Sequence, residues 1–123
     1  MREVRKLSDA QRFLTKDGFS IKEIVSPRNS PLKKQSLAEA TVAPGKTTKR
    51  HKHKQSEETY FILRGRGKIF LRDKAVKVTK GTAIAILAGT PHRIENVGRV
   101  PLVFLCHCSP AYAHSNTVIL PEV

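Results

Sequence analysis

The segment HKHKQSEE, residues 51–58, decides the fold prediction, because it sets two histidines two positions apart and ends in a carboxylate. On an extended strand such neighbours share a face, so His51 and His53 point one way and Lys52 points the other. Two imidazoles, neutral at pH 7, can bind a metal, whereas an apolar interior would leave them without hydrogen-bond partners. The segment therefore favours a metal site inside a β-structure. The alternative is a pair of surface histidines on a basic hairpin.

Short apolar runs separated by glycine and proline continue on both sides of this segment. We expect strands at residues 19–25, 35–42, 48–53, 59–63, 68–72, 75–78, 82–87, 92–96 and 101–108, an edge segment at 117–120, and a turn of helix from Ser8 to Leu14. Many short strands with such punctuation indicate a β-sandwich or barrel. We expect one domain, residues 1–123, with a core barrel over about 36–110. The extension, residues 1–35, has strand signals of its own and is expected to wrap the barrel.

Two spaced motifs resemble those of the cupin family. Gly45-x5-His51-x-His53-x4-Glu58-x6-Gly65 matches the first cupin motif at every position, and Gly81-x5-Leu87-x-Gly89-x2-His92-x3-Asn96 matches the second except at Leu87, where the family usually has proline. The resemblance implies an all-β double-stranded β-helix, a jelly-roll barrel, with metal ligands at His51, His53, Glu58 and His92. The spacing to Gly65 selects Glu58 over Glu57, which is expected to face outward and pair with a nearby Lys or Arg.

This ligand set leaves open positions on an octahedral metal. The resemblance implies one divalent ion, with Mn, Fe, Ni, Zn and Co all open. The chain is also similar to small stand-alone cupins, of the RmlC-like superfamily, that are named after mannose-6-phosphate isomerase. We therefore expect a metal-binding cupin that acts on or senses a small anionic metabolite, with isomerase-like activity on a sugar phosphate as the enzymatic form. The alternatives are an Fe(II)-dependent dioxygenase and a ligand-binding module without activity. No residue has a clear signal for a catalytic base.

The charge balance is strongly basic, with 23 Lys and Arg against 10 Asp and Glu and a formal net charge of +13. Such a field attracts anions of any kind. Specific nucleic-acid binding is not expected, because no reading motif accompanies the charge and only seven aromatic residues are available for stacking (5 Phe and 2 Tyr). No apolar run is long enough for a membrane helix, and no signal peptide is recognisable, so a cytoplasmic location is expected.

Five further side chains, on the C-terminal strand and beside the first motif, carry expectations of their own. Cys106 and Cys108 share a face of one strand and are expected to be small apolar fillers, with metal binding by the pair as the alternative. His107 faces the other way, and a role beside the site is open. Phe61 and Leu63 alternate away from Glu58, so either the N-terminal strands or a second subunit must cover them. We expect a homodimer.

Overall fold

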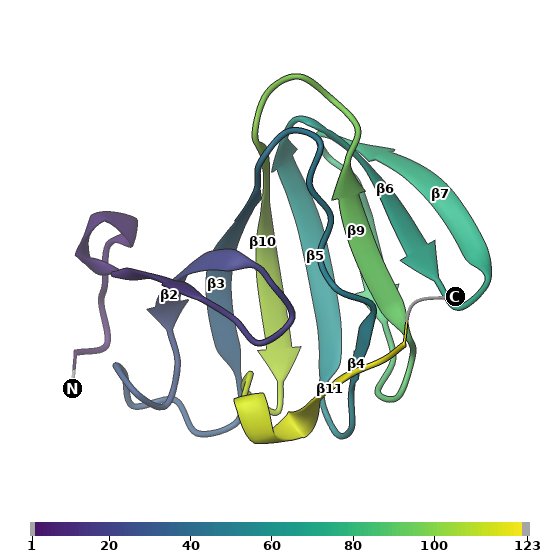
Figure 1. Cartoon of the computed structure of the whole chain (residues 1–123). Coiled ribbons are helices and arrows are strands. Elements are labelled where there is room, and N and C mark those ends of the chain that lie inside the picture. The colour runs from purple at the N-terminus through teal and green to yellow at the C-terminus, as the bar shows by residue number, and fades with distance from the viewer. Residues whose placement is uncertain (1, 122–123) are drawn as a thin grey trace.

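The computed structural model describes residues 2–121, which form eleven strands in two antiparallel sheets (Figure 1). The elements are η1 (Leu7–Asp9), β1 (Arg12–Leu14), β2 (Ser20–Val25), β3 (Ser36–Val42), β4 (His51–His53), β5 (Glu57–Arg64), β6 (Arg66–Leu71), β7 (Lys74–Thr79), β8 (Ala83–Ile86), β9 (His92–Asn96), β10 (Leu102–Ser109), η2 (His114–Asn116) and β11 (Thr117–Ile119). One sheet has the order β1-β2-β3-β10-β5-β8 and the other β11-β4-β9-β6-β7. The all-β prediction is confirmed.

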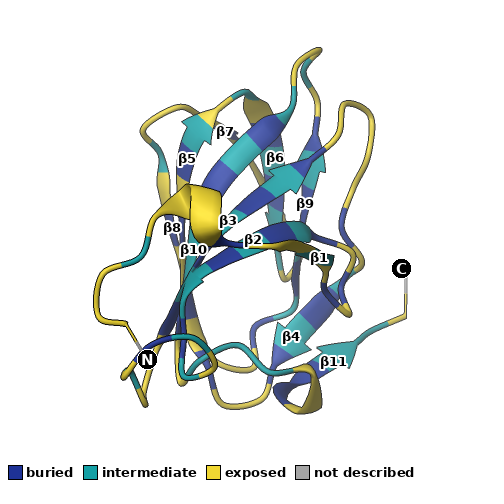
Figure 2. Ribbon diagram, turned by 90° about the vertical axis from the view of Figure 1, so that its left-hand side faces the viewer, coloured by how far each residue is buried: buried dark blue, intermediate teal, exposed yellow. Residues whose placement is uncertain are grey.

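Alternating burial along the strands places the core between the two sheets. In β5 the side chains of Glu58, Tyr60 and Ile62 are buried, whereas Phe61 points outward. Figure 2 shows the same alternation of buried and more exposed residues on the neighbouring strands. The apolar core includes Ile69 and Ile94 of the five-stranded sheet and Phe104 of the six-stranded sheet. Strand periodicity thus lets both sheets contribute to one interior.

The N-terminal strands extend the six-stranded sheet. β2 pairs with β3, and β1 pairs with β2 through Phe13 and Ile21. The helical turn expected up to Leu14 is wrong: the helix is confined to the short 3₁₀ turn η1, and an extended strand follows. Phe13 packs against the core from this strand, and burial of that ring favours the extended backbone over a helical one.

Most other strands lie where the sequence predicted them, with shifted ends. β4 begins at His51 and not at Thr48, although the N–H of Thr48 already donates to the carbonyl oxygen of Ile94 in the partner strand β9. β5 begins earlier than expected, at Glu57. Within residues 2–121, no helix is long and apolar enough to cross a membrane.

Candidate metal centre

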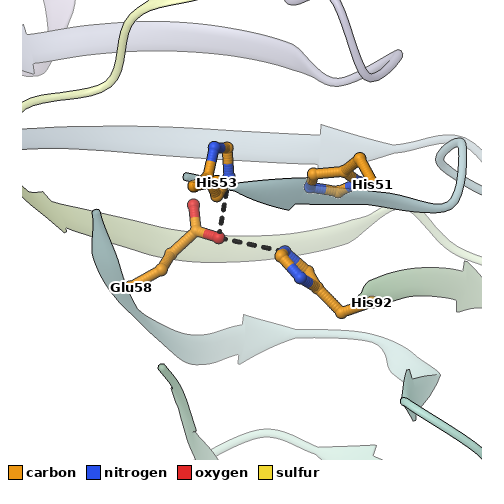
Figure 3. Close-up of side chains that lie close together, drawn as sticks. All are labelled: His51, His53, Glu58 and His92. Atoms are coloured by element: carbon orange, nitrogen blue, oxygen red, sulfur yellow. Dashed lines mark hydrogen bonds and ion pairs between the residues drawn. The ribbon is translucent and has the colours of Figure 1, made fainter. Parts of the chain in front are cut away.

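Four buried polar side chains from both sheets converge inside the barrel (Figure 3). His51 and His53 share the inner face of β4, whose middle residue points outward. His92 begins β9 and lies opposite His51 in the antiparallel register. Glu58 comes from the inner face of β5 in the other sheet. The structure therefore brings together all four residues that the motifs predicted as ligands.

The ligand atoms of these four residues are close enough to surround one ion. They all lie within 4.8 Å of one another. Glu58 Oε1 is 3.1 Å from His92 Nε2 and 3.2 Å from His53 Nε2. The rings of His51 and His92 pack with their centroids 4.1 Å apart. Three nitrogens and one oxygen at these separations form a donor set suited to a divalent transition metal.

The outer nitrogen of each imidazole has a partner that turns the other nitrogen toward the centre. Nδ1 of His51 lies 2.6 Å from the carbonyl oxygen of Lys49, and Nδ1 of His92 lies 2.8 Å from that of Thr90. Carbonyl oxygens only accept, so Nδ1 carries the proton and, in the neutral rings, Nε2 keeps its lone pair. His53 is held by Thr117 of β11, with 3.0 Å between Nδ1 and Oγ1. Outer partners of this kind orient metal-binding histidines.

The inner nitrogens of two histidines lack hydrogen bonds although they are buried. Neither His51 Nε2 nor His53 Nε2 has a hydrogen-bond partner in the described chain. A carboxylate oxygen lies close to each of them, with Asp17 Oδ2 at 2.8 Å from His51 Nε2 and Glu58 Oε1 at 3.2 Å from His53 Nε2. A nitrogen lone pair that faces a carboxylate oxygen is unfavourable, so either a proton or a metal cation is needed between the two atoms. The residues present therefore fit a metal ion.

The carboxylate of Glu58 is ionised despite its burial. Burial alone would raise its pKa, but the contacts and charges of His53 and His92 outweigh this and hold the pKa well below its usual value. Its second oxygen, Oε2, accepts hydrogen bonds from the thiols of Cys106 at 2.8 Å and Cys108 at 3.2 Å. Glu58 thus presents Oε1 to the histidines as an anionic ligand.

Both cysteines lie inward beside this carboxylate, so they are more than apolar fillers. The hydrogen bond with Cys108, burial and the charge of Glu58 together raise the pKa of the Cys106 thiol well above its usual value. For Cys108, the hydrogen bond with Cys106 lowers the pKa, but burial and Glu58 outweigh it and raise it. Both groups are neutral thiols and donate to Glu58.

Asp17 is a site residue that the sequence did not reveal. It lies in the turn between β1 and β2, and its Oδ2 is 2.8 Å from His51 Nε2. Its backbone oxygen accepts from Lys49 N at 2.9 Å, and its side chain accepts a short hydrogen bond from Thr15. Burial would raise the pKa of Asp17 and lower that of His51, but their mutual contact prevails and shifts each the other way. Without metal, the two form a buried ion pair.

Aromatic side chains of the core pack against the four residues. Tyr60, Phe19 and Phe104 pack mutually, with 4.7–6.0 Å between ring centroids. The Tyr60 hydroxyl is fully buried and has no hydrogen-bond partner in the described chain. Burial raises its pKa well above the usual value, so the group stays a neutral donor. The site therefore combines polar donors on one side with aromatic side chains on the other.

Other residues singled out in the sequence lie away from this centre. Glu57 is exposed as expected, but no ion pair joins it to a Lys or Arg in residues 2–121, so the predicted pairing is wrong. His107 faces outward, where its ring contacts Gln35 at 2.8 Å. Asn96 is buried and secures a turn by donating to the carbonyl oxygens of Val42 and Val100.

The chain is similar in sequence to a known domain family and to known proteins of other organisms. Residues 38–108 match the model of the cupin domain family. The chain is 49% identical over 108 residues to an uncharacterised protein of Methanocaldococcus jannaschii, covering 88% of this chain and 86% of that one. It is 34% identical over 73 residues to the oxalate-binding protein of Thermotoga maritima, covering 59% of this chain and 60% of that protein.

A solved structure of similar size shares the same architecture. The crystal structure of a predicted oxalate decarboxylase from Thermotoga maritima superposes with a TM-score of 0.75 at 26% identity. The match covers 87% of this chain and 98% of that one. The family match and this superposition agree on one fold.

Proposed function

Since the chain belongs to the cupin family, we propose that it binds one divalent metal ion on His51, His53, Glu58 and His92 and that the open positions of this ion bind a small anionic metabolite. The observation that carries the proposal is the pair of buried Nε2 atoms without hydrogen bonds beside an ionised carboxylate. A bound divalent ion would supply Lewis-acid chemistry at this point of the barrel. The four residues come from three strands of two sheets, so only the folded barrel assembles them.

A small carboxylate is the ligand class that we favour, because an oxalate-sized anion can offer two oxygens to adjacent coordination positions of the metal ion. The similarity to an oxalate-binding protein and to a predicted oxalate decarboxylase supports the same class.

Proton transfer on a bound sugar phosphate, the isomerase-like activity, is a second candidate function. Asp17 favours it, because a buried carboxylate beside the ligand set is a group that can accept a proton from a substrate. The sequence offered no such base. Asp17 would hold the proton at Oδ2 and return it to a neighbouring substrate atom. This reading requires the turn between β1 and β2 to move and admit a sugar.

Metal content separates the remaining alternatives. Iron in the purified chain, with oxygen consumption, would favour a dioxygenase, whereas zinc or manganese without turnover would favour a binding module. A cytoplasmic location is part of the proposal and follows from the sequence expectation alone.

Calorimetric titration tests the proposed function. Metal-loaded protein is titrated with oxalate and, separately, with mannose 6-phosphate, and the same is done with His92→Ala. We expect oxalate to bind the metal-loaded wild type and to lose measurable affinity both in His92→Ala and after chelation. Oxalate affinity that survives chelation and the variant would place the anion elsewhere. Preference for mannose 6-phosphate would select the second candidate.

A further inference from the structure

A second group of potential ligands lies directly behind Glu58. Cys106 and Cys108 occupy the same face of β10, and their Sγ atoms lie 2.8 and 3.2 Å from Glu58 Oε2. One ligand atom from each of the three residues lies within 4.8 Å of the others. Register explains the placement, since Cys108 lies opposite Glu58 and Cys106 opposite Tyr60 on β5. Two thiols and a carboxylate thus converge without any change of backbone.

The two ligand groups share one residue and are otherwise separate. Glu58 directs Oε1 toward His53 and His92 and Oε2 toward the two thiols. A carboxylate can bridge two cations in this way, one on each oxygen. The histidine group offers nitrogen donors, whereas the second group offers sulfur. Because sulfur prefers softer metals, the two groups differ in the ions that they select.

The adjoining cavity has the charge of a cation site. It holds about 20 Å³, and its polar lining includes Asp17, Glu23 and Glu58 together with the two cysteines. None of the 23 Lys and Arg residues of the chain is among the residues that line it. Glu23 is paired with Arg28 and Asp17 with His51, so the Oε2 atom of Glu58 carries the negative charge that faces the two thiols. In a chain with a net charge of +13, this cavity is a local exception that attracts positive ions.

We propose that Cys106, Cys108 and Glu58 form a second cation site, selective for a thiophilic divalent ion such as Zn²⁺ or Cd²⁺, and joined to the histidine site through the Glu58 carboxylate. Binding forms two metal–sulfur bonds, of about 2.3 Å for Zn²⁺, and releases the two thiol protons to the solvent, with no change of oxidation state. A water molecule in the adjoining cavity completes the coordination. This site does not require that the histidine site be filled.

The competing explanation is that the thiols only orient Glu58 for the histidine site. Loss of an outer partner typically weakens a metal site by about 10–100-fold and leaves its stoichiometry unchanged. Loss of the thiolate ligands removes one bound ion and its sulfur signature. Stoichiometry and spectroscopy therefore separate the two explanations.

The test titrates the reduced, metal-free full chain with Cd²⁺ and follows the thiolate-to-metal charge-transfer absorption in the ultraviolet. We expect two ions per chain in the wild type, one of them with the charge-transfer band. The Cys106→Ser, Cys108→Ser double variant keeps two hydrogen-bond donors and should bind one ion without the band. His92→Ala should lose the nitrogen-bound ion and keep the band. Circular dichroism checks that each variant is folded.

Each outcome decides a separate claim. A wild type that shows no band overturns the thiolate site, and so does a band that persists in the double serine variant. A wild type that binds one ion with the band, unaffected by His92→Ala, supports the thiolate site and contradicts the proposed histidine site. Zinc-edge X-ray absorption gives an independent reading, since sulfur neighbours at about 2.3 Å appear only if the thiolates bind.

Discussion

At the scale of single residues, the contact between Asp17 and His51 joins the N-terminal strands to the candidate metal centre. The two residues are 34 positions apart, and 2.8 Å separates Oδ2 from Nε2. Because Nε2 is also the atom that would bind the metal, Asp17 and the ion compete for one position. Metal-free protein keeps the ion pair, and metal-loaded protein must redirect Asp17.

The first prediction concerns the pH dependence of this pair in the metal-free chain. The pKa of His51 is raised from its ordinary value of 6.5, so its stabilisation is full below that value and is lost as pH rises through the folded-state pKa. The pKa of Asp17 is lowered from 3.8, so its stabilisation is full above 3.8 and is lost as pH falls through the folded-state pKa. Both contributions are complete between pH 3.8 and 6.5.

Asp17→Asn removes this dependence. In urea unfolding with chelator present, we expect the wild type to exceed the variant by about 1–3 kcal/mol near pH 5, and by less at about pH 9. Other titrating groups are common to both proteins and cancel in the difference. Two stability curves that stay parallel from pH 5 to pH 9 would show that the pair is not charged.

The four predicted ligands could be found from the sequence because strand alternation and the spacing of the two motifs identify them. His51 and His53 had to share a face, and the motif supplied Glu58 and His92. Asp17 could not be found in this way, because its approach depends on how the turn between β1 and β2 packs against β4. The same holds for Thr117, which reaches His53 only after β11 pairs with β4. Contacts between strands that are distant in the sequence produce no local spacing pattern from which they could be predicted.

At the scale of elements, the turn between β5 and β6 presses against the start of β10. Gly65 adopts a positive φ of 89°, and a Cβ placed there would lie 2.7 Å from the carbonyl oxygen of Pro101 and 3.0 Å from the Cα of Leu102. Backbone atoms cannot move aside as a flexible side chain can. The turn therefore requires glycine for both its dihedral angle and its close approach.

Gly65→Ala tests this approach against a matched control. Gly81 has nearly the same dihedral angle, with a φ of 88°, but an added Cβ there meets no atom within 4 Å. We expect Gly81→Ala to lose about 1–2 kcal/mol of unfolding free energy from the left-handed backbone alone. Gly65→Ala should lose about 1–3 kcal/mol more, from the clash. Equal losses in thermal or urea unfolding would contradict the contact.

The strands themselves were largely predictable, whereas their ends were not. Residues 92–96 were expected as a strand and form β9 with the same bounds. The error at Leu14 arose because the polar residues from Ser8 onward suit a helix start as well as a strand edge. Burial of Phe13 against the core favours the strand over the helix, and local helix propensity does not predict such burial.

At the scale of the whole molecule, the outer face of the six-stranded sheet is apolar and uncovered around β5. Phe61 remains 41% exposed, and Leu63, Val103 and Leu105 lie partly exposed beside it. The N-terminal strands do not cover Phe61, because β1 and β2 extend the sheet beyond β3, away from β5. The sequence analysis expected either the N-terminal strands or a second subunit to bury Phe61 and Leu63. Because the N-terminal strands do not, we propose that the chain forms a homodimer through this face.

Phe61→Lys tests the homodimer. A charge on each copy at the centre of the face should shift the chain toward monomer by at least tenfold in dissociation constant, while metal content stays unchanged because Phe61 points away from the site. Light scattering over a concentration series measures the shift. A wild type that is monomeric at every practical concentration would refute the dimer.

The basic surface is expected to speed the arrival of an anion more than to hold it. Lys52 alternates away from His51 and His53, and Arg50, Arg72 and Arg93 line an open groove around Phe70 on the outer side of the five-stranded sheet. The groove also borders His92, but the side chains of Lys52 and Arg93 alternate away from the inner Nε2 atoms. These charges raise the local anion concentration, an effect screened beyond roughly 8 Å at physiological ionic strength.

Changing Lys52 and Lys54 to Glu tests this role by stopped-flow binding. Oxalate association with the metal-loaded chain should slow a few-fold at low salt and converge with the wild type at high salt, while dissociation stays constant. An oligonucleotide run in parallel examines the prediction that nucleic acid is not specifically bound. Faster oxalate dissociation in the variant would show that these lysines hold the ligand.

The central claim is that His51, His53, Glu58 and His92 bind one metal ion, and anomalous X-ray scattering from crystals grown with Mn²⁺ tests it most directly. Mn²⁺ prefers oxygen and nitrogen ligands, so the thiol group should stay free of it. We predict one anomalous peak inside the barrel, about 2.0–2.3 Å from the three Nε2 atoms and Glu58 Oε1. A barrel without a peak in metal-supplemented crystals, or a peak on other side chains, would contradict the account.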